Sequence, residues 1–259
     1  IMPDCLFLNG NSSINLKSGD AFPDMKSKDI FKAIMGEGSK SEIMASKGVH
    51  KNYAVGSNGF NISSIQFALH YMFEKEEILN NFMKNISECT ALNGYFIGTC
   101  YNGGKVFNML KAKDQNETIA LFSEKQKIWE ITKRYNHENF NNDESCLGYA
   151  IDIYQETINK TFREYLVNFN YLNRILENYG FVKLTSDELK ELGLNNSVGS
   201  FEELYNDIQE KSNTDFSLKN SLGNTFKMTK EEKQISFLNN YFVYKKIRNN
   251  TDFKKLTEL

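Results

Sequence analysis

Arginine, histidine and long apolar runs are scarce in this 259-residue sequence. Only four of its 31 basic residues are arginine, and only three histidines and one tryptophan occur. No stretch of 18 apolar residues exists, which excludes a membrane-spanning helix. A formal charge of −2 argues against indiscriminate coating of a nucleic-acid backbone, while a specific nucleic-acid ligand stays compatible with it. The first residues form no charged-then-apolar leader, so we expect no export.

The common catalytic and metal-binding motifs are also missing. Gly103-Gly104-Lys105-Val106 has neither the upstream glycine nor the Ser/Thr of a phosphate-binding loop. No Gly-x-Ser-x-Gly elbow and no His-Glu-x-x-His motif occurs. The four cysteines are too scattered for a paired metal motif, and no histidine has a cysteine or second histidine at metal spacing. We therefore expect no metal site, and thiols rather than a disulfide framework.

What the sequence does have is an alternation of strand and helix patterns. We expect strands at 4–9, 60–66, 95–99, 126–133, 149–154, 181–184 and 241–246, and helices at 29–35, 75–89 and 170–179. Asn93-Gly94 has the composition of a turn. Three hydroxyl residues, each followed three positions later by glutamate, predict further helix starts at Thr185, Ser200 and Thr229.

The order strand, helix, strand between residues 60 and 99 is that of a crossover unit in an α/β sheet. We therefore predict a mostly parallel, twisted sheet with helices on both faces, which ends in antiparallel strands that include 241–246. No convincing linker interrupts the chain. We expect one α/β domain over 1–259 with an insertion near 111–165.

The segment Gln66-Phe67-Ala68-Leu69-His70-Tyr71 follows a predicted strand at the edge where open α/β sheets bind ligands. Amide, aromatic, imidazole and phenol groups occupy positions that a structural turn fills with Gly, Asn or Ser. Taken alone, the hexapeptide has a plain alternative interpretation. Phe67 and Leu69 would belong to the core, and His70 and Tyr71 would be satisfied polar residues at its edge.

The whole chain resembles the mRNA cap guanine-N7 methyltransferases. The runs that carry the similarity, in order and spacing, are residues 60–71 with the hexapeptide above, 85–88, 94–99, 151–157, 163–167 and 237–244. The version is most similar to the methyltransferase module of capping enzymes from large cytoplasmic DNA viruses. Frequent lysine and asparagine beside rare arginine agree with AT-rich coding.

The resemblance implies a Rossmann-like S-adenosylmethionine-dependent methyltransferase fold and an enzyme that methylates N7 of the guanine cap of mRNA. It implies that His70, Tyr71, Glu164 and Tyr241 bind the cap guanine. It also implies that S-adenosyl-L-methionine is the cofactor, with cofactor-binding residues Asn11, Ser12, Gln66, Phe67 and Tyr71. No catalytic acid, base or nucleophile is expected, because guanine N7 already has a lone pair. Without the family context, Glu164 would be a solvated carboxylate near Arg163, and Tyr241 and Phe67 would be core aromatics.

The sequence departs from the family in three places. Asn11 stands where an Asp reads the adenine, and Cys100-Tyr101 stands where many members have Thr-Pro near the base. The Gly-rich cofactor loop and the ribose-binding acid of the family have no counterpart here, so we expect an N-terminally incomplete fold. Either the chain is a fragment or a partner completes the site, and we expect these residues alone to bind S-adenosylmethionine weakly or not at all.

Two other functions stay open: a catalytically inactive cap-binding or stimulatory subunit, and a structural partner in a heterodimer. The expected partners are the capped mRNA 5′ end and other capping-enzyme domains or a small activating subunit, without a membrane. The expected location is cytoplasmic, in a viral factory or virion if the source is viral.

Overall fold

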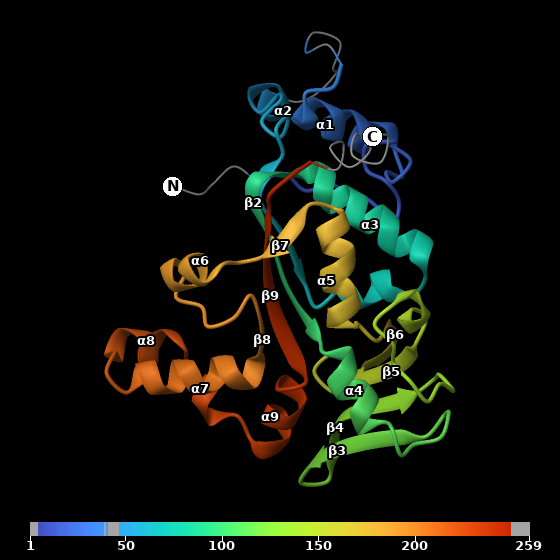
Figure 1. Ribbon diagram of the computed structural model, residues 1–259, viewed down its shortest axis with the longest axis vertical. Coiled ribbons are helices and arrows are strands. Elements are labelled where there is room, and N and C mark those ends of the chain that lie inside the picture. The colour runs from blue at the N-terminus through green and yellow to red at the C-terminus, as the bar shows by residue number, and fades with distance from the viewer. Residues whose placement is uncertain (1–4, 39, 41–46, 250–259) are drawn as a thin grey trace.

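The computed structural model describes residues 5–38, 40 and 47–249, which form an α/β structure with two sheets (Figure 1). The first sheet has the order β1 (Phe60–Gln66), β2 (Thr90–Tyr101), β9 (Asn239–Lys246), β7 (Phe181–Lys183), and β8 (Val198–Ser200) also pairs with β9. β1 runs parallel to β2, with Ile62 opposite Tyr95 and Gln66 opposite Thr99. This confirms that the strands predicted at 60–66 and 95–99 lie in one sheet.

The prediction of a mostly parallel sheet is wrong for the described strands. β9 is antiparallel to β2, β7 and β8, so only the β1–β2 pair is parallel. A parallel neighbour requires a crossover connection. Among the described strands, only β1 and β2 are neighbours joined by one, through α3 (Glu76–Cys89). The antiparallel strand expected at 241–246 is confirmed as β9.

Helix α3 forms because its sequence suits both its start and its buried face. Glu76 and Glu77 lie in its first turn, where acidic side chains favour the helix dipole. Leu79, Phe82 and Met83 recur at helical spacing and are buried against the first sheet. Helix α5 (Phe169–Asn178) packs into the same core cluster, together with Phe96 of β2 and Phe242 and Tyr244 of β9.

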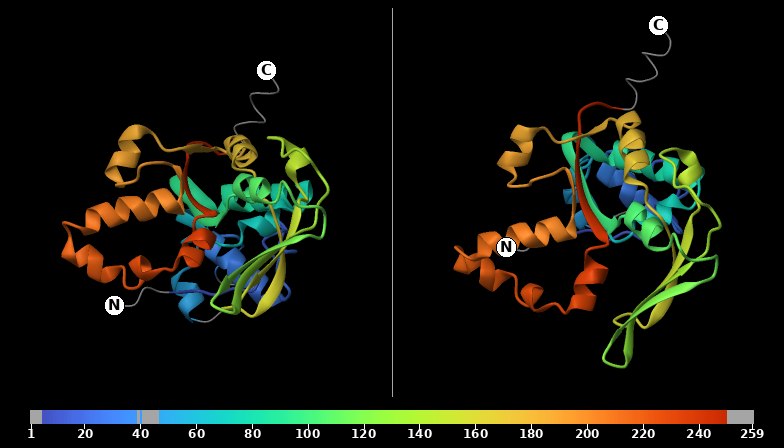
Figure 2. Two further views of the ribbon diagram at one scale, coloured as in Figure 1. Left: turned by 90° about the horizontal axis from the view of Figure 1, so that it is seen from below. Right: turned by 60° about the horizontal axis from the view of Figure 1, so that its bottom comes forward.

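Helices lie on both sides of the first sheet, as predicted. α3, α4 (Gly103–Met109) and α5 lie on one side of β9, and α6 (Ser186–Glu191), α7 (Phe201–Ser212) and α8 (Phe216–Ser221) lie on the other (Figures 1 and 2). The three predicted helix starts are all confirmed as reciprocal capping boxes. Thr185, Ser200 and Thr229 begin α6, α7 and α9 (Lys230–Ser236) respectively.

The second sheet lies within the segment expected to be an insertion. Its antiparallel strands are β3 (Thr118–Ser123), β4 (Gln126–Lys133), β5 (Ala150–Gln155) and β6 (Lys160–Tyr165). The inner face presents Trp129, Ile131 and Ile153, which are buried in a second core cluster with residues of α4. Trp129 is therefore a core residue.

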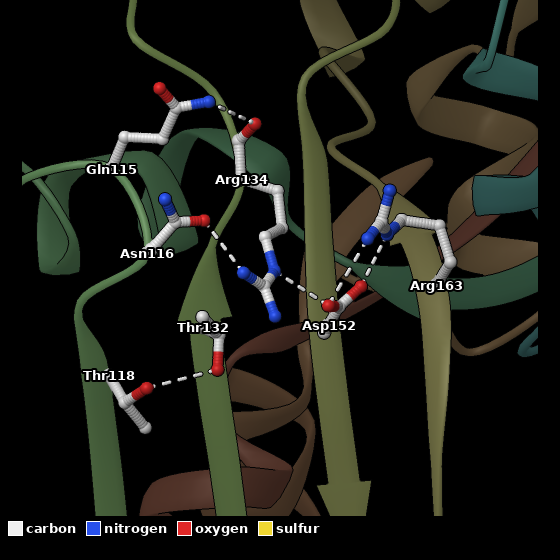
Figure 3. Close-up of polar contacts among 7 residues, drawn as sticks. All are labelled: Gln115, Asn116, Thr118, Thr132, Arg134, Asp152 and Arg163. Carbon is white, nitrogen blue, oxygen red and sulfur yellow. Dashed lines mark hydrogen bonds and ion pairs between the residues drawn. The ribbon is translucent and has the colours of Figure 1, made fainter.

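The outer face of the second sheet is polar, and its centre is Asp152 (Figure 3). Arg134 Nε donates to Asp152 at 2.6 Å, and Arg163 also pairs with this carboxylate. Arg134 also donates to Asn116 Oδ1 at 2.6 Å. Side chains of successive strand residues point to opposite faces, so Arg163 lies on the outer face while its neighbour Glu164 points inward.

Several local predictions are wrong. Residues 5–9 form no strand, because no described strand lies beside them, and Phe7 is 90% exposed; residue 4 lies outside the described residues. Asn93-Gly94 is not a turn but an irregularity inside β2, where the register with β1 shifts and Asn93 has a φ of +63°. The helix expected at 29–35 begins earlier, as α1 (Met25–Met35), and α2 (Lys47–Lys51) was not predicted.

The remaining helical segments are short 3-10 turns: η1 (Leu69–Phe73), η2 (Glu144–Cys146) and η3 (Thr225–Lys227). No helix in the described part of the chain is long and apolar enough to cross a membrane. η1 follows directly after β1, and it contains the last three residues of the hexapeptide.

Candidate functional site

A cavity of about 690 Å³ opens between the end of β1, the inner face of the second sheet, the start of α7 and one side of α9. It is lined by Phe67, His70, Tyr71, Tyr101, Ser123, Ile128, Ile153, Gln155, Glu156, Thr157, Ile158, Phe162, Glu164, Phe201, Thr229, Glu232, Ile235, Ser236 and Asn239. Its volume lies in the usual range for small-molecule sites, roughly 300–1,000 Å³. Its wall is mainly apolar, and a few polar side chains enter it.

The backbone is strained where β1 ends. Phe67 has a φ of +51°, which is unusual for a residue other than glycine. Its N–H donates to the carbonyl of Thr99 at 2.8 Å, which holds the turn against β2. The Phe67 ring is 55% exposed, with the ring of Phe201 edge-on at 6.2 Å. Strained residues cluster at binding sites, so the turn marks this cavity as a functional candidate.

His70 of η1 and Glu164 of β6 lie side by side in the wall of the cavity. His70 Nδ1 lies 3.5 Å from Glu164 Oε2, and the residues are 4% and 8% exposed. Neither His70 nitrogen has a hydrogen-bond partner in the described structure, and Glu164 Oε2 has none either. Buried polar atoms without partners are uncommon in proteins, and at a cavity they indicate groups that await a ligand.

Burial shifts both titrations toward the neutral forms. It lowers the pKa of His70 to about 4 and raises the pKa of Glu164 to about 7. Around neutral pH the imidazole is therefore uncharged, and the two residues do not form an ion pair despite their 3.5 Å separation. A neutral imidazole offers one N–H donor, and an ionised carboxylate offers only acceptors.

Tyr71 and Tyr101 bring two phenols to the cavity. The Tyr71 ring lies edge-on to the His70 ring, with 4.2 Å between the ring centroids. Burial is the main cause, and the Glu164 charge the second, of the raised pKa of Tyr71. The Tyr101 hydroxyl accepts a hydrogen bond from Trp129 Nε1 at 3.3 Å and another from Gln155 Nε2 at 3.1 Å. Tyr101 therefore links the end of β2 in the first sheet to β4 and β5 in the second.

The structure brings together four of the predicted site residues: Phe67, His70, Tyr71 and Glu164 all line the cavity. Tyr241 does not line it. Its ring lies against Gly199, where a Cβ would stand 2.5 Å from its hydroxyl. Asn239, two residues earlier in β9, lines the cavity instead, and its buried Oδ1 has no partner among the described atoms.

Gln66 is the last residue of β1, and its side chain forms hydrogen bonds with residues of β1 and β2. Its Oε1 accepts from Thr99 Oγ1 at 2.8 Å, and its Nε2 donates to Ser64 at 2.9 Å. Gln66 is not among the residues that line the cavity.

Asn11 and Ser12 lie elsewhere. The Asn11 side chain accepts from the backbone and hydroxyl of Ser13, and the Ser12 carbonyl accepts from Asn85. Asn85 is in the second half of α3, close to the start of β2, whereas Gln66 is the last residue of β1 and Phe67 follows it. Seven strand residues span roughly 20 Å. The residues predicted to bind S-adenosylmethionine thus lie in two places in the described structure: Phe67 and Tyr71 line the cavity, whereas Asn11 and Ser12 lie beside α3.

Sequence reasoning missed Tyr101, Gln155 and Asn239 as lining residues. Tyr101 stands at a departure from the family pattern. Gln155 and Asn239 lie in the similar runs 151–157 and 237–244, but nothing in those runs singles them out as lining residues. Their place depends on how the second sheet packs over the end of β2. No cluster of three or more His, Cys, Asp or Glu suited to a metal occurs in the described part of the chain.

The fold and the cavity define an α/β protein with a buried histidine–glutamate pair at the carboxyl end of a parallel strand pair. The mRNA (guanine-N(7))-methyltransferase domain matches residues 21–247, which is most of the chain. The chain belongs to this family.

Curated relatives agree with this assignment. A probable mRNA-capping enzyme of Acanthamoeba polyphaga mimivirus is 28% identical over 77% of this chain and 18% of its own length. An mRNA cap guanine-N(7) methyltransferase of Aspergillus niger is 31% identical over 38% of this chain and 16% of its own length. This chain therefore spans less than a fifth of the length of either relative. The CcbJ methyltransferase structure from Streptomyces caelestis overlaps with a TM-score of 0.39 at 9% identity, over 82% of this chain and 63% of that one.

Proposed function

We propose that this chain binds the guanine cap at the mRNA 5′ end and transfers a methyl group to its N7 from S-adenosylmethionine. The observation that carries the proposal is the buried pair His70 and Glu164, whose polar atoms face a cavity without partners. Guanine presents a keto acceptor beside two N–H donors. The His70 N–H matches the keto oxygen, and the Glu164 carboxylate matches the two donors.

The chemistry requires little from the protein beyond placement. When bound, S-adenosylmethionine would supply the methyl group of its sulfonium, whose S–CH3 bond breaks as the bond to N7 forms and which leaves as S-adenosylhomocysteine; guanine N7 has a lone pair for this bond. No general base is needed, so the contribution of the chain is to hold the base, orient N7 and exclude water. His70 and Glu164 fix the base edge, and Phe67, Tyr71 and Phe162 give the cavity apolar walls.

A second function is favoured by the separation of Asn11 and Ser12 from the cavity. A chain that holds the cap but not the cofactor would act as a cap-binding or stimulatory subunit without catalysis of its own. Cap binding is common to both proposals, and only methyl transfer separates them.

The partners and the location are also proposals. The similarity to a mimivirus capping enzyme, of which this chain matches 18%, supports association with other capping-enzyme domains. It likewise supports a viral source and a cytoplasmic viral factory as the place of action.

The test uses the chain with a short RNA that begins with unmethylated GpppA. Binding is measured by fluorescence anisotropy, and methyl transfer by radiolabel from S-adenosylmethionine. The cap site is supported if free GpppA displaces the bound RNA and free ApppA does not. Binding without transfer supports the non-catalytic subunit, and no preference for guanine refutes both proposals.

A further inference from the structure

Some polar groups of the cavity can act either as a hydrogen-bond donor or as an acceptor toward a ligand, whereas others can act in only one of these ways. Neutral His70 carries one donor and one acceptor nitrogen, and it can exchange them by changing tautomer. Glu164, with a pKa raised to about 7, accepts when ionised and can donate when protonated. These two groups alone could therefore adapt to guanine or to a purine with a reversed pattern.

Tyr101 cannot adapt in this way. A phenol hydroxyl has one donor and two acceptor positions. Trp129 Nε1 donates to it at 3.3 Å and Gln155 Nε2 donates at 3.1 Å, so both acceptor positions are occupied. Only the O–H donor of Tyr101 remains available to a ligand, and Tyr101 lines the cavity.

The second sheet places both partners of the Tyr101 hydroxyl beside it. Trp129 and Gln155 face each other as register partners on β4 and β5, and Trp129 is 1% exposed. The indole N–H can only donate. Burial raises the pKa of Tyr101 to about 12, so the hydroxyl keeps its proton throughout the physiological range.

We propose that Tyr101 is a specificity-determining residue of the cavity, a hydrogen-bond donor of fixed sense that requires an acceptor atom on the purine. The inference rests on the proposed cap-binding function and deepens it. A purine that presents an amino group to the hydroxyl leaves two donors facing each other without a partner. A site with a buried polar group rejects such a ligand more strongly than an apolar wall does.

The experiment is a cycle between protein and ligand changes. The chain and its Tyr101→Phe variant are titrated with GpppA and with three analogues that each remove one acceptor of the capping base. The analogues carry 2-aminopurine, which lacks the keto oxygen and also the N1–H donor, 3-deazaguanine, which lacks N3, or 7-deazaguanine, which lacks N7, in place of guanine. The matched control is Tyr154→Phe, since Tyr154 lies on the outer face of the second sheet, next to Gln155, and its hydroxyl donates to Asn159 Oδ1.

We expect Tyr101→Phe to weaken GpppA binding roughly 10-fold, and to have almost no effect on the one analogue that lacks the acceptor used. Tyr154→Phe should bind all four ligands like the parent chain. Gln155→Leu keeps the phenol but frees one acceptor position, so it should reduce the preference for GpppA over ApppA. Such a gain of tolerance does not follow from loss of packing.

Two results would overturn the inference, and they are distinguishable. If the parent chain prefers GpppA but Tyr101→Phe weakens all four ligands equally, or none, the hydroxyl does not read the purine. If the parent chain shows no preference for guanine, the proposed function itself fails, and the role of Tyr101 fails with it. Melting curves of each variant show whether a uniform loss reflects misfolding.

Discussion

His70 Nδ1 lies 3.5 Å from Glu164 Oε2, yet the two side chains do not form an ion pair around neutral pH. Burial favours neutral imidazole and disfavours ionised carboxylate. The two side chains come from η1 and β6, which are about ninety residues apart in sequence, and both lose water without gaining a partner. An arrangement that is unfavourable in the free chain becomes favourable when a ligand supplies the missing hydrogen bonds.

Replacement of Glu164 by glutamine tests the acceptor role directly. The variant keeps the size and shape of the side chain but turns one acceptor oxygen into a donor, which then faces an N–H of guanine. An unmatched buried donor costs about 1–3 kcal/mol, so cap affinity and methyl transfer should each fall by roughly one to two orders of magnitude. The measurements are the binding and radiolabel assays described above. Unchanged binding would show that Glu164 does not contact the base.

Patterns with a local cause were predictable from the sequence. The capping boxes at Thr185, Ser200 and Thr229 need only residues three positions apart, and all three form. The helix expected at 170–179 forms as α5, and Gly180 just beyond it has a φ of +89°, which glycine adopts at low cost. The strand expected at 4–9 failed because an apolar run becomes a strand only where a neighbour offers hydrogen bonds.

The site was predictable only in part, for a similar reason. The segment 66–71 and Glu164 carried family motifs, and the structure brings Phe67, His70, Tyr71 and Glu164 to one cavity. The family run 237–244 contains both Asn239 and Tyr241, but the resemblance implied a role for Tyr241 only. Whether Asn239 or Tyr241 enters the cavity depends on how β9 meets β8, since Tyr241 packs on Gly199. A strand pattern in sequence does not determine which end of a strand borders a cavity.

Removal of the imidazole should weaken cap binding at His70 but have no effect at His137. His70 is buried at the cavity, so His70→Ala should weaken GpppA binding by roughly 10-fold through loss of a buried donor. His137 is exposed and stacks on Tyr149 at 4.5 Å, away from the residues that line the cavity. His137→Ala should bind like the parent chain. Equal losses in the two variants would refute the assignment of His70 to the site.

The close approach of strands at Gly98 gives a prediction about stability. A Cβ at this position would stand 2.3 Å from the Ile65 carbonyl oxygen and 2.4 Å from the Phe242 ring. Gly98→Ala should therefore destabilise the first sheet by about 1–3 kcal/mol or more, measured by urea unfolding. Gly104→Ala is the control, since a Cβ there meets only the Asn102 side chain at 3.2 Å. A parent-like Gly98→Ala variant would contradict the described packing of β1, β2 and β9.

The raised pKa of Glu164 also predicts how stability depends on pH in the ligand-free chain. Its pKa rises from an ordinary 4.5 to about 7 on folding, because burial penalises the charged form. The folded chain therefore holds this proton more tightly than the unfolded chain does. Below pH 4.5 the residue costs nothing, and stability is lost as the pH rises through about 7. His70 acts in the opposite sense, because its pKa falls to about 4, and its contribution is lost as the pH drops from 6.5 toward 4.

The difference in melting temperature between Glu164→Gln and the parent chain isolates the Glu164 contribution, because both proteins retain His70. At pH 4.5 the parent carries a neutral carboxyl that resembles the amide, so the two should melt at similar temperatures. At pH 8 the parent must bury a charge, so the variant should be more stable by on the order of 1–3 kcal/mol, or a few degrees. Saturating GpppA should shrink this advantage, because guanine donors stabilise the ionised carboxylate. A difference that is independent of pH, or that favours the parent at pH 8, would mean that Glu164 is paired in the folded chain and does not await a ligand.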